Sequence, residues 1–273
     1  MPSLPDDSVL KDFVLGKLQK YTAIQSLSGQ EANFLKVLQE DFDEDYKGNW
    51  RKVFLDDQPY YYFRESTIGG HFNKDALIRN HFLITHVDRV PIYRNNNVTT
   101  ITSDEVQVQG QLDNIIGITV ARTLVHIGLP IKILFTTDEE RVRSVSQVLE
   151  VCKLSKHIPI TVDIDIFNDL SEFEEGLITL RRKDQSGLMA PSLVDKLQHI
   201  AKFYKIPFTE DKGYAIVETG FLSSATKGEY LGGHVGIPLV NYHSDEEITA
   251  WKVVYNTIKI LYNFFIINNP YII

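Results

Sequence analysis

The chain has 273 residues and a formal net charge of −8, from 28 Lys and Arg against 36 Asp and Glu. That balance, with no long run of Lys or Arg, argues against nucleic acid or an anionic membrane as a partner. A hydrophobic fraction of 43% allows a sizeable core. The single cysteine, Cys152, excludes an internal disulfide and a cysteine-based zinc site.

Neither end of the chain has the composition of a membrane segment. The N-terminal MPSLPDDSVLKDF carries early acids and no apolar core, so it does not resemble a signal peptide. Residues 248–267 are the most apolar stretch, but Lys252 and Lys259 interrupt it, which favours an amphipathic terminal helix. We therefore expect a cytoplasmic protein with no membrane partner.

The predicted elements alternate between helices and strands along most of the chain. Residues 7–41 are expected to form two helices, and Ser28 with Glu31 has the spacing of a capping box for the second. The other predictions, in chain order, are two short strands in 49–65, a turn at Gly69 and Gly70, a strand at 76–85, a loop or short hairpin at 89–105, a helix at 114–127, a strand at 131–136, a helix at 140–152, a strand at 158–167, irregular polar chain at 168–190, a helix at 191–204, strands at 214–217 and 239–242, and a final helix at 244–263.

This order of elements predicts an α/β fold. We expect a single domain over residues 1–273, with a doubly wound, mostly parallel mixed sheet flanked by helices. In such sheets the functional site lies beyond the carboxyl ends of the strands. Four candidate side chains fall just past, or late in, a predicted strand: His86, Glu140, Asp163 and His243.

Acidic and histidine residues gather in four segments, LITHVD, GQLDNIIG, LFTTDEE and ITVDIDIF. Three of these segments follow apolar, β-branched runs that are typical of buried strands. A charged group at the end of a buried strand is costly to desolvate unless something compensates its charge. A bound cation is the simplest compensation, so the pattern favours a two-metal hydrolase site.

The segment LITHVD contains a possible metal ligand, because a neutral imidazole binds zinc well. Residues i and i+2 share one face of an extended chain, so Asp88 can orient the ring of His86. Asp113 has two carboxylate oxygens and can bridge two cations, although a helix N-cap is the better explanation when this position is taken alone.

The adjacent glutamates of TTDEE can divide two duties between them. One can bind metal while the other acts as general base on a water molecule, and the alternative is a pair of acids in a first helical turn. Asp163 and Asp165 share one face of a strand, and either can supply a further ligand. His243, taken alone, is as easily a surface or capping residue.

The order of these motifs resembles the co-catalytic di-zinc exopeptidase superfamily, and most closely its glutamyl/deblocking aminopeptidase family. The resemblance is carried by SLSGQE, LITHVD, GQLDNIIG, LFTTDEE, ITVD and IPLVNYHSDEE, in that order. The segment PSLVDKLQHIAKFYKIPF is also similar to a family segment.

The resemblance implies hydrolysis of peptide or amide substrates at the N-terminus, with two divalent cations, zinc before cobalt or manganese. Glu139 would be the general base and Asp88 the partner of His86. Asp163 is preferred to Asp165 because TVD matches the family's strand-end Asp, and the peptide bond Asp113–Asn114 would be cis. The implied metal ligands are His86 and Asp163, each on one metal, Asp113 bridging both, and Glu140 with His243 completing the other metal.

Three departures from the family limit what the resemblance implies. Only a short segment separates Asp88 from Asp113, where the family inserts a domain that helps to build large hollow assemblies, so we do not expect such an assembly. RVRSVSQ follows Glu140 where a glycine-containing turn is usual, and FLSSATKGE around Ser223 lacks the family's Thr-Asp pair. The alternative is therefore a metal-binding protein of peptidase fold that has lost catalysis and serves as a binding or structural subunit.

Overall fold

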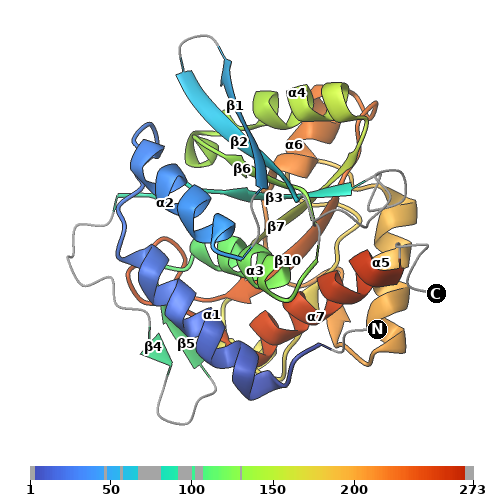
Figure 1. Cartoon of the computed structure of the whole chain (residues 1–273). Helices are drawn as coiled ribbons and strands as arrows, with labels where there is room; N and C mark the ends of the chain where they lie inside the picture. The colour runs from blue at the N-terminus through green and yellow to red at the C-terminus, as the bar shows by residue number, and fades with distance from the viewer. Residues whose placement is uncertain are drawn as a thin grey trace.

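The computed structural model describes residues 4–45, 48–55, 58–66, 81–91, 100–101, 107–129 and 131–267, and its centre is a mixed sheet (Figure 1). The strand order is β1-β2-β6-β3-β7-β10-β8-β9, in which β6, β3, β7 and β10 are parallel. The strands of this sheet are β1 (Gly48–Leu55), β2 (Gln58–Ser66), β3 (His81–His86), β6 (Ile133–Thr136), β7 (Ile158–Ile166), β8 (Ile178–Thr179), β9 (Phe208–Thr209) and β10 (Gly233–Leu239).

A small second sheet joins two segments that lie far apart in the sequence. It has the order β11-β5-β4, with β5 (Gln107–Gly110) antiparallel to both β4 (Thr100–Ile101) and β11 (Glu247–Ala250). The register places Glu247 opposite Gly110. This pairing brings the chain before Asp113 next to the chain after His243.

Helices cover both faces of the large sheet (Figure 1), as a doubly wound fold requires. On one face α3 and α7 lie against the strands, with α1, α2 and α5 around them, and on the other face lie α4 and α6. No helix in the described part of the chain is long and apolar enough to cross a membrane. The helices are α1 (Asp7–Thr22), α2 (Ala32–Asp43), α3 (Ile115–His126), α4 (Val145–Ser155), α5 (Pro191–Phe203), α6 (Glu218–Ala225) and α7 (Trp251–Ile267).

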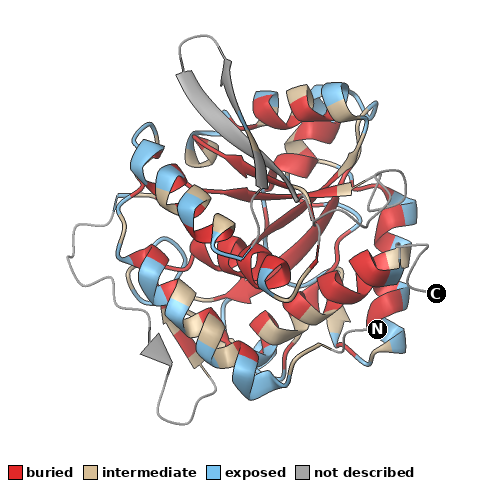
Figure 2. Ribbon diagram, viewed as in Figure 1, coloured by how far each residue is buried: buried red, intermediate tan, exposed pale blue. Residues whose placement is uncertain are grey.

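The central strands are buried on both faces, and red ribbon fills the middle of Figure 2. Leu83 of β3 packs into the larger cluster beneath α3 and α7, while Phe82 and Ile84 pack into the smaller cluster with α4 and α6. Successive side chains of a strand point to opposite faces, so a continuous apolar run is what a strand buried on both faces needs.

The structure confirms the predicted fold class and most of the predicted elements. Helices occur at the predicted ranges 7–41, 114–127 and 191–204, and strands at 49–65, 131–136 and 158–167, with ends that differ by at most two residues from the predicted outer bounds. The strand predicted at 76–85 is observed from His81 onward. The turn at Gly69 and Gly70, residues 76–80 of that strand and most of the loop at 89–105 lie outside the described residues.

Several element boundaries were predicted wrongly, for physical reasons. The helix expected at 140–152 begins at Val145, because residues Glu139–Arg141 form a 3₁₀ turn first. The strand expected at 239–242 is β10, which contains two glycines and a proline and so lacks strand propensity in its sequence. Of the strand expected at 214–217, only a bridge between Tyr214 and Ile166 forms. The final helix begins at Trp251, after β11.

The predicted capping box is also wrong. The second helix begins at Ala32, and its N-cap, Glu31, makes no side-chain cap hydrogen bond. The Oε1 atom of Glu31 accepts hydrogen bonds from the backbone N–H groups of Gly29 (2.9 Å) and Asp138 (3.2 Å) instead. The hydroxyl of Ser28 donates to Asp88, which is part of the site described next.

Candidate metal centre

Five side chains predicted as metal ligands converge at the carboxyl ends of the parallel strands. Parallel strands bring their carboxyl ends to one edge of the sheet, and four of the five side chains lie late in, or soon after, such strands. Asp113 follows the antiparallel β5, and the pairing of β5 with β11 brings it to the other four. His86 is the last residue of β3, and Asp163 lies late in β7. The remaining three follow a strand within a few residues: Asp113 after β5, Glu140 after β6 and His243 after β10.

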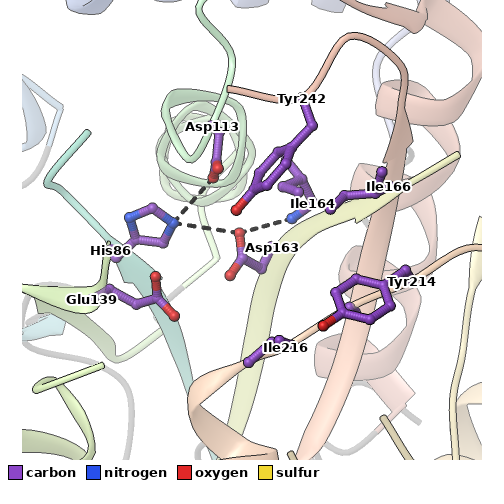
Figure 3. Close-up of a pocket in the computed structure, with 10 residues that line it drawn as sticks. His86, Asp113, Glu139, Asp163, Ile164, Ile166, Tyr214, Ile216 and Tyr242 are labelled. Atoms are coloured by element: carbon purple, nitrogen blue, oxygen red, sulfur yellow. Dashed lines mark hydrogen bonds and ion pairs between the residues drawn. The ribbon is translucent and has the colours of Figure 1, made fainter. Parts of the chain in front are cut away.

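The ligands form two groups that share Asp113. In the first group, Nε2 of His86 lies 3.1 Å from Oδ1 of Asp113 and 3.5 Å from Oδ1 of Asp163 (Figure 3). In the second, Nε2 of His243 lies 3.6 Å from Oδ2 of Asp113 and 3.2 Å from Oε2 of Glu140. The two oxygens of Asp113 therefore face different groups, as a carboxylate that bridges two cations must.

The residues fit two divalent cations. Each group offers three ligand atoms that lie within 4.8 Å of one another. Imidazole nitrogen and carboxylate oxygen are donors that zinc, cobalt and manganese accept. Oε1 of Glu140 is buried and has no hydrogen-bond partner among the described residues, which is costly unless a cation binds it.

The electrostatics of the cluster also favour added positive charge. Burial raises the pKa of Asp163 to about 7 against the opposing effect of His86. Burial would raise the pKa of Asp113 too, but hydrogen bonds from His243 and His86 lower it to about 2. The pKa of His243 rises to about 9, because Asp113 and Glu140 outweigh its own burial. The negative charge of the carboxylates therefore favours protonated imidazoles. Bound cations would compensate the same negative charge.

The carboxylate of Asp88 holds the turn that carries both glutamates. Oδ1 accepts from the backbone N–H of Glu139 (3.0 Å), and Oδ2 accepts from the N–H of Glu140 (3.1 Å) and from the hydroxyl of Ser28 (2.7 Å). The ring of His86 lies 3.0 Å from the backbone oxygen of Asp88 but 3.7 Å from its carboxylate. Asp88 thus orients His86 mainly through its main chain, and its carboxylate positions the glutamates.

Asn114, rather than Asp113, caps the helix that follows. The amide oxygen of Asn114 accepts from the N–H of Gly117 (2.9 Å), and its Nδ2 donates to the backbone oxygen of Val162 (2.8 Å). The peptide bond between Asp113 and Asn114 is cis, as the resemblance implies. The N-cap interpretation of Asp113 is therefore wrong, and its carboxylate is directed to the cluster.

The structure separates Asp163 from Asp165, which the sequence left as alternatives. Asp163 lies beside His86, whereas Asp165 accepts hydrogen bonds from Thr179 and from Nε of Arg181 (3.0 Å). Ser223, in the segment that lacks the family's Thr-Asp pair, is buried on α6. Its hydroxyl accepts a hydrogen bond from the N–H of Leu188 (3.4 Å). Neither Asp165 nor Ser223 lines the pocket described below.

Two buried glutamates were not predicted. Glu247 accepts hydrogen bonds from the backbone N–H groups of Leu112 (2.6 Å), Asp113 (3.0 Å) and His243 (2.8 Å). It therefore fixes the main chain at Asp113 relative to the main chain at His243. Its position in the SDEE segment next to His243 was visible in the sequence, but two of its partners, Leu112 and Asp113, are more than a hundred residues away.

Glu218, the second, opens α6 and is fully buried. Its Oε1 accepts from the hydroxyl of Thr136 (2.8 Å), and one of its oxygens lies within 4.8 Å of oxygens of Glu139 and Asp163. Burial first, and then the neighbouring carboxylates, raise the pKa of Glu139 well above its ordinary value despite His86. The carboxylate of Glu139 is thus a proton acceptor of raised basicity.

A cavity of about 250 Å³ opens onto this cluster (Figure 3). Four of the residues that line it belong to the cluster and six are apolar or aromatic. The lining residues are His86, Asp113, Glu139, Asp163, Ile164, Ile166, Tyr214, Ala215, Ile216 and Tyr242.

Comparison with known proteins gives one family and many similar folds. The family model described as M42 glutamyl aminopeptidase matches residues 84–260. No curated protein matches the chain. An aminopeptidase from the archaeon Desulfurococcus kamchatkensis is similar in structure, with a TM-score of 0.72 and 12% identity over 93% of this chain and 95% of that chain.

A second similar structure is the TET1 peptidase of Pyrococcus horikoshii, with a TM-score of 0.72 and 11% identity over 92% of this chain and 99% of that chain. A third is a TET aminopeptidase from Thaumarchaeota archaeon SCGC AB-539-E09, with a TM-score of 0.70 and 11% identity over 93% and 96% of the two chains. At such low identity these structures show a shared fold.

Proposed function

Because the chain belongs to the M42 glutamyl aminopeptidase family, we propose that it is a metal-dependent aminopeptidase with a two-metal site and Glu139 as general base. The observation that carries this proposal is the position of Asp113, whose two oxygens face two separate ligand groups beside Glu139. The substrate is a peptide with a free N-terminus.

Each cation would have its own ligands, with Asp113 common to both. His86 and Asp163 would hold the first with Asp113, and Glu140 and His243 would hold the second. Zinc suits this nitrogen and oxygen donor set best, with cobalt and manganese as alternatives. Two such cations supply Lewis acidity that polarises the scissile carbonyl and acidifies a water molecule.

Glu139 performs the proton transfers in this mechanism. Its carboxylate takes a proton from the attacking water and gives it to the leaving amine. Asp88 keeps Glu139 in place, because it accepts the backbone N–H groups of Glu139 and Glu140 with its two oxygens.

Replacement of Glu139 by Gln tests the proposal, because it keeps the shape of the side chain and removes its basicity. We expect aminopeptidase turnover to fall by about 10²–10⁴-fold while two metals stay bound. The exposed Glu174→Gln serves as the matched control and should leave turnover unchanged. Unchanged turnover in Glu139→Gln would contradict the proposal. Two bound metals in a wild-type chain that cleaves no peptide would favour the non-catalytic alternative.

A further inference from the structure

The cavity has a charged end and an apolar end (Figure 3). His86, Asp113, Glu139 and Asp163 form the charged end, where the reacting bond would lie. The opposite wall is formed by Ile164, Ile166, Tyr214, Ala215, Ile216 and Tyr242. Figure 3 shows Tyr214 and Ile216 on one side of this space and Tyr242 on the other, above Asp163.

This wall leaves large apolar side chains unusually exposed. The exposed fractions are 43% for Tyr214, 39% for Ile216 and 37% for Tyr242. All three meet at one cavity rather than being scattered over the surface. A concave apolar surface next to a few polar groups is the usual form of a pocket for a ligand side chain.

Hydrogen bonds hold the wall in shape before any ligand binds. Tyr214 exchanges two backbone hydrogen bonds with Ile166 at the end of β7, of 2.8 and 2.9 Å. The next residue, Ala215, accepts from the N–H of Gln185 (3.2 Å). On the opposite side, the ring of Tyr242 stacks on that of His243 with 3.6 Å between centroids. The wall is therefore fixed relative to the metal ligands.

No lysine or arginine is among the described residues that line this cavity. Arg181 and Lys183 line a neighbouring pocket that shares only Tyr214 and Ala215 with it. The guanidinium of Arg181 is already bound to Asp165 and to the backbone oxygens of Glu210 and Lys212. A carboxylate placed against the apolar wall would thus exchange water for apolar side chains, and the described residues of the wall offer it no lysine or arginine.

We propose that the apolar wall receives the side chain of the substrate's N-terminal residue and selects large apolar residues such as leucine and phenylalanine against acidic ones. This inference rests on the proposed function and adds the substrate class. Apolar contact with Ile216, Tyr214 and Tyr242 supplies the preference for a large side chain. The absence of lysine and arginine from the described lining residues supplies the discrimination against glutamate and aspartate.

A series of aminoacyl anilides tests the preference directly, with the zinc-loaded full chain. We expect kcat/KM for the leucyl and phenylalanyl anilides to exceed that for the glutamyl anilide by about 100-fold. Equal or faster cleavage of the glutamyl anilide would overturn the proposal.

The variant Ile216→Lys places a cation in the wall and should shift the specificity. We expect the ratio of glutamyl to leucyl kcat/KM to rise by about 10-fold or more. Leu154→Lys is the matched control, because Leu154 is an apolar side chain of α4 that is 66% exposed and lies outside the cavity. An unchanged ratio in a folded Ile216→Lys protein would overturn the assignment of this wall.

A binding measurement separates this inference from the proposed function. Calorimetry on the zinc-loaded Glu139→Gln variant should show tighter binding of L-leucinamide than of L-glutamic acid α-amide, and Ile216→Lys should reduce the difference. If no anilide is cleaved but leucinamide binds preferentially, the proposed function fails and the selectivity stands. Equal binding of the two amides, or binding of neither, would overturn the selectivity.

Discussion

At the scale of single residues, Glu247 shows how the site depends on a side chain that touches no proposed substrate or metal. Its two oxygens accept three backbone N–H groups, from Leu112, Asp113 and His243. Burial and the nearby Asp113 raise its pKa to about 8, against the effect of these N–H groups. Glu247 therefore positions the shared ligand and the last ligand relative to each other.

We expect Glu247→Ala to weaken zinc binding by about 10–100-fold, the usual effect of losing a group that orients metal ligands. Competition with a chromogenic chelator measures the affinity. The exposed neighbour provides the control, Glu246→Ala, which should keep wild-type affinity. Wild-type zinc affinity in Glu247→Ala would show that the main chain holds the ligands without it.

A second residue, Asp41, should control stability at low pH. It is buried and accepts hydrogen bonds from Lys17 (2.7 Å), Tyr21 and Arg122 (2.9 Å). Burial alone would raise the pKa of Asp41, but these bonds together with Lys20 hold it well below its ordinary value. Because the folded pKa is lower than the unfolded pKa, the stabilisation is complete above about pH 4 and is lost as the pH falls through the folded pKa.

The variant Asp41→Asn should therefore reduce the free energy of unfolding by about 2–3 kcal/mol at pH 7, because the buried Arg122 loses one of its two carboxylate partners and keeps only Asp45. The loss should shrink as the pH falls below about 4. Urea denaturation between pH 3 and 7 measures both effects, with the exposed Asp12→Asn as control. A loss that is independent of pH would contradict this account of Asp41.

At the scale of elements, the turn Glu139–Arg141 carries the proposed general base and a proposed metal ligand, and it is followed by a strained residue. Val142 has a φ of 59°, in the left-handed region that β-branched residues rarely adopt. This is where the sequence departs from the family's glycine-containing turn. The N–H groups of Glu139 and Glu140 donate to Asp88 and maintain the turn. The absence of a glycine here therefore affects local stability more than it affects the position of Glu139.

We expect Val142→Gly to raise the free energy of unfolding by about 1 kcal/mol, because glycine adopts positive φ without strain. Val9→Gly is the matched control: Val9 is also exposed but lies in α1, where glycine should cost about 1 kcal/mol. Thermal unfolding of both variants measures the difference. Equal losses of stability in the two would show that Val142 is not strained.

The elements also show which parts of the structure a sequence can predict. Strands β3, β6 and β7 were recognisable because each is rich in apolar or β-branched residues, as a strand buried on both faces requires. Strand β10 was not, because Gly236 is required by its neighbours: a side chain there would overlap Thr179 and Asp165. The sequence of β10, GHVGIPL, is determined by tertiary contacts rather than by local strand propensity.

The same contrast holds for the site. The proposed ligands His86, Asp113 and His243 were predicted from the order of the motifs that contain them, and the structure brings these side chains together. Glu218 and Glu247 act through partners in distant segments, and no local pattern distinguishes them from surface acids. Such contacts become visible only when the fold places the segments side by side.

At the scale of the whole molecule, assembly is the property on which the sequence and the similar structures differ. The Pyrococcus horikoshii TET1 peptidase is described as assembling into a tetrahedron or a large octahedral shell. This chain has only a short segment between Asp88 and Asp113, where the family's inserted domain contributes to assembly. We therefore expect a monomer or small oligomer. Light scattering measures the mass, and a particle of about twelve chains or more would contradict this expectation.

The central claim is a site for two metals that share Asp113, and elemental analysis tests it most directly. Protein purified with added zinc should contain about two metal ions per chain, and Asp113→Ala should lose most of both. The exposed Asp211→Ala should keep both. Absence of metal from the wild-type chain, or full retention in a folded Asp113→Ala variant, would contradict the two-metal site and the chemistry derived from it.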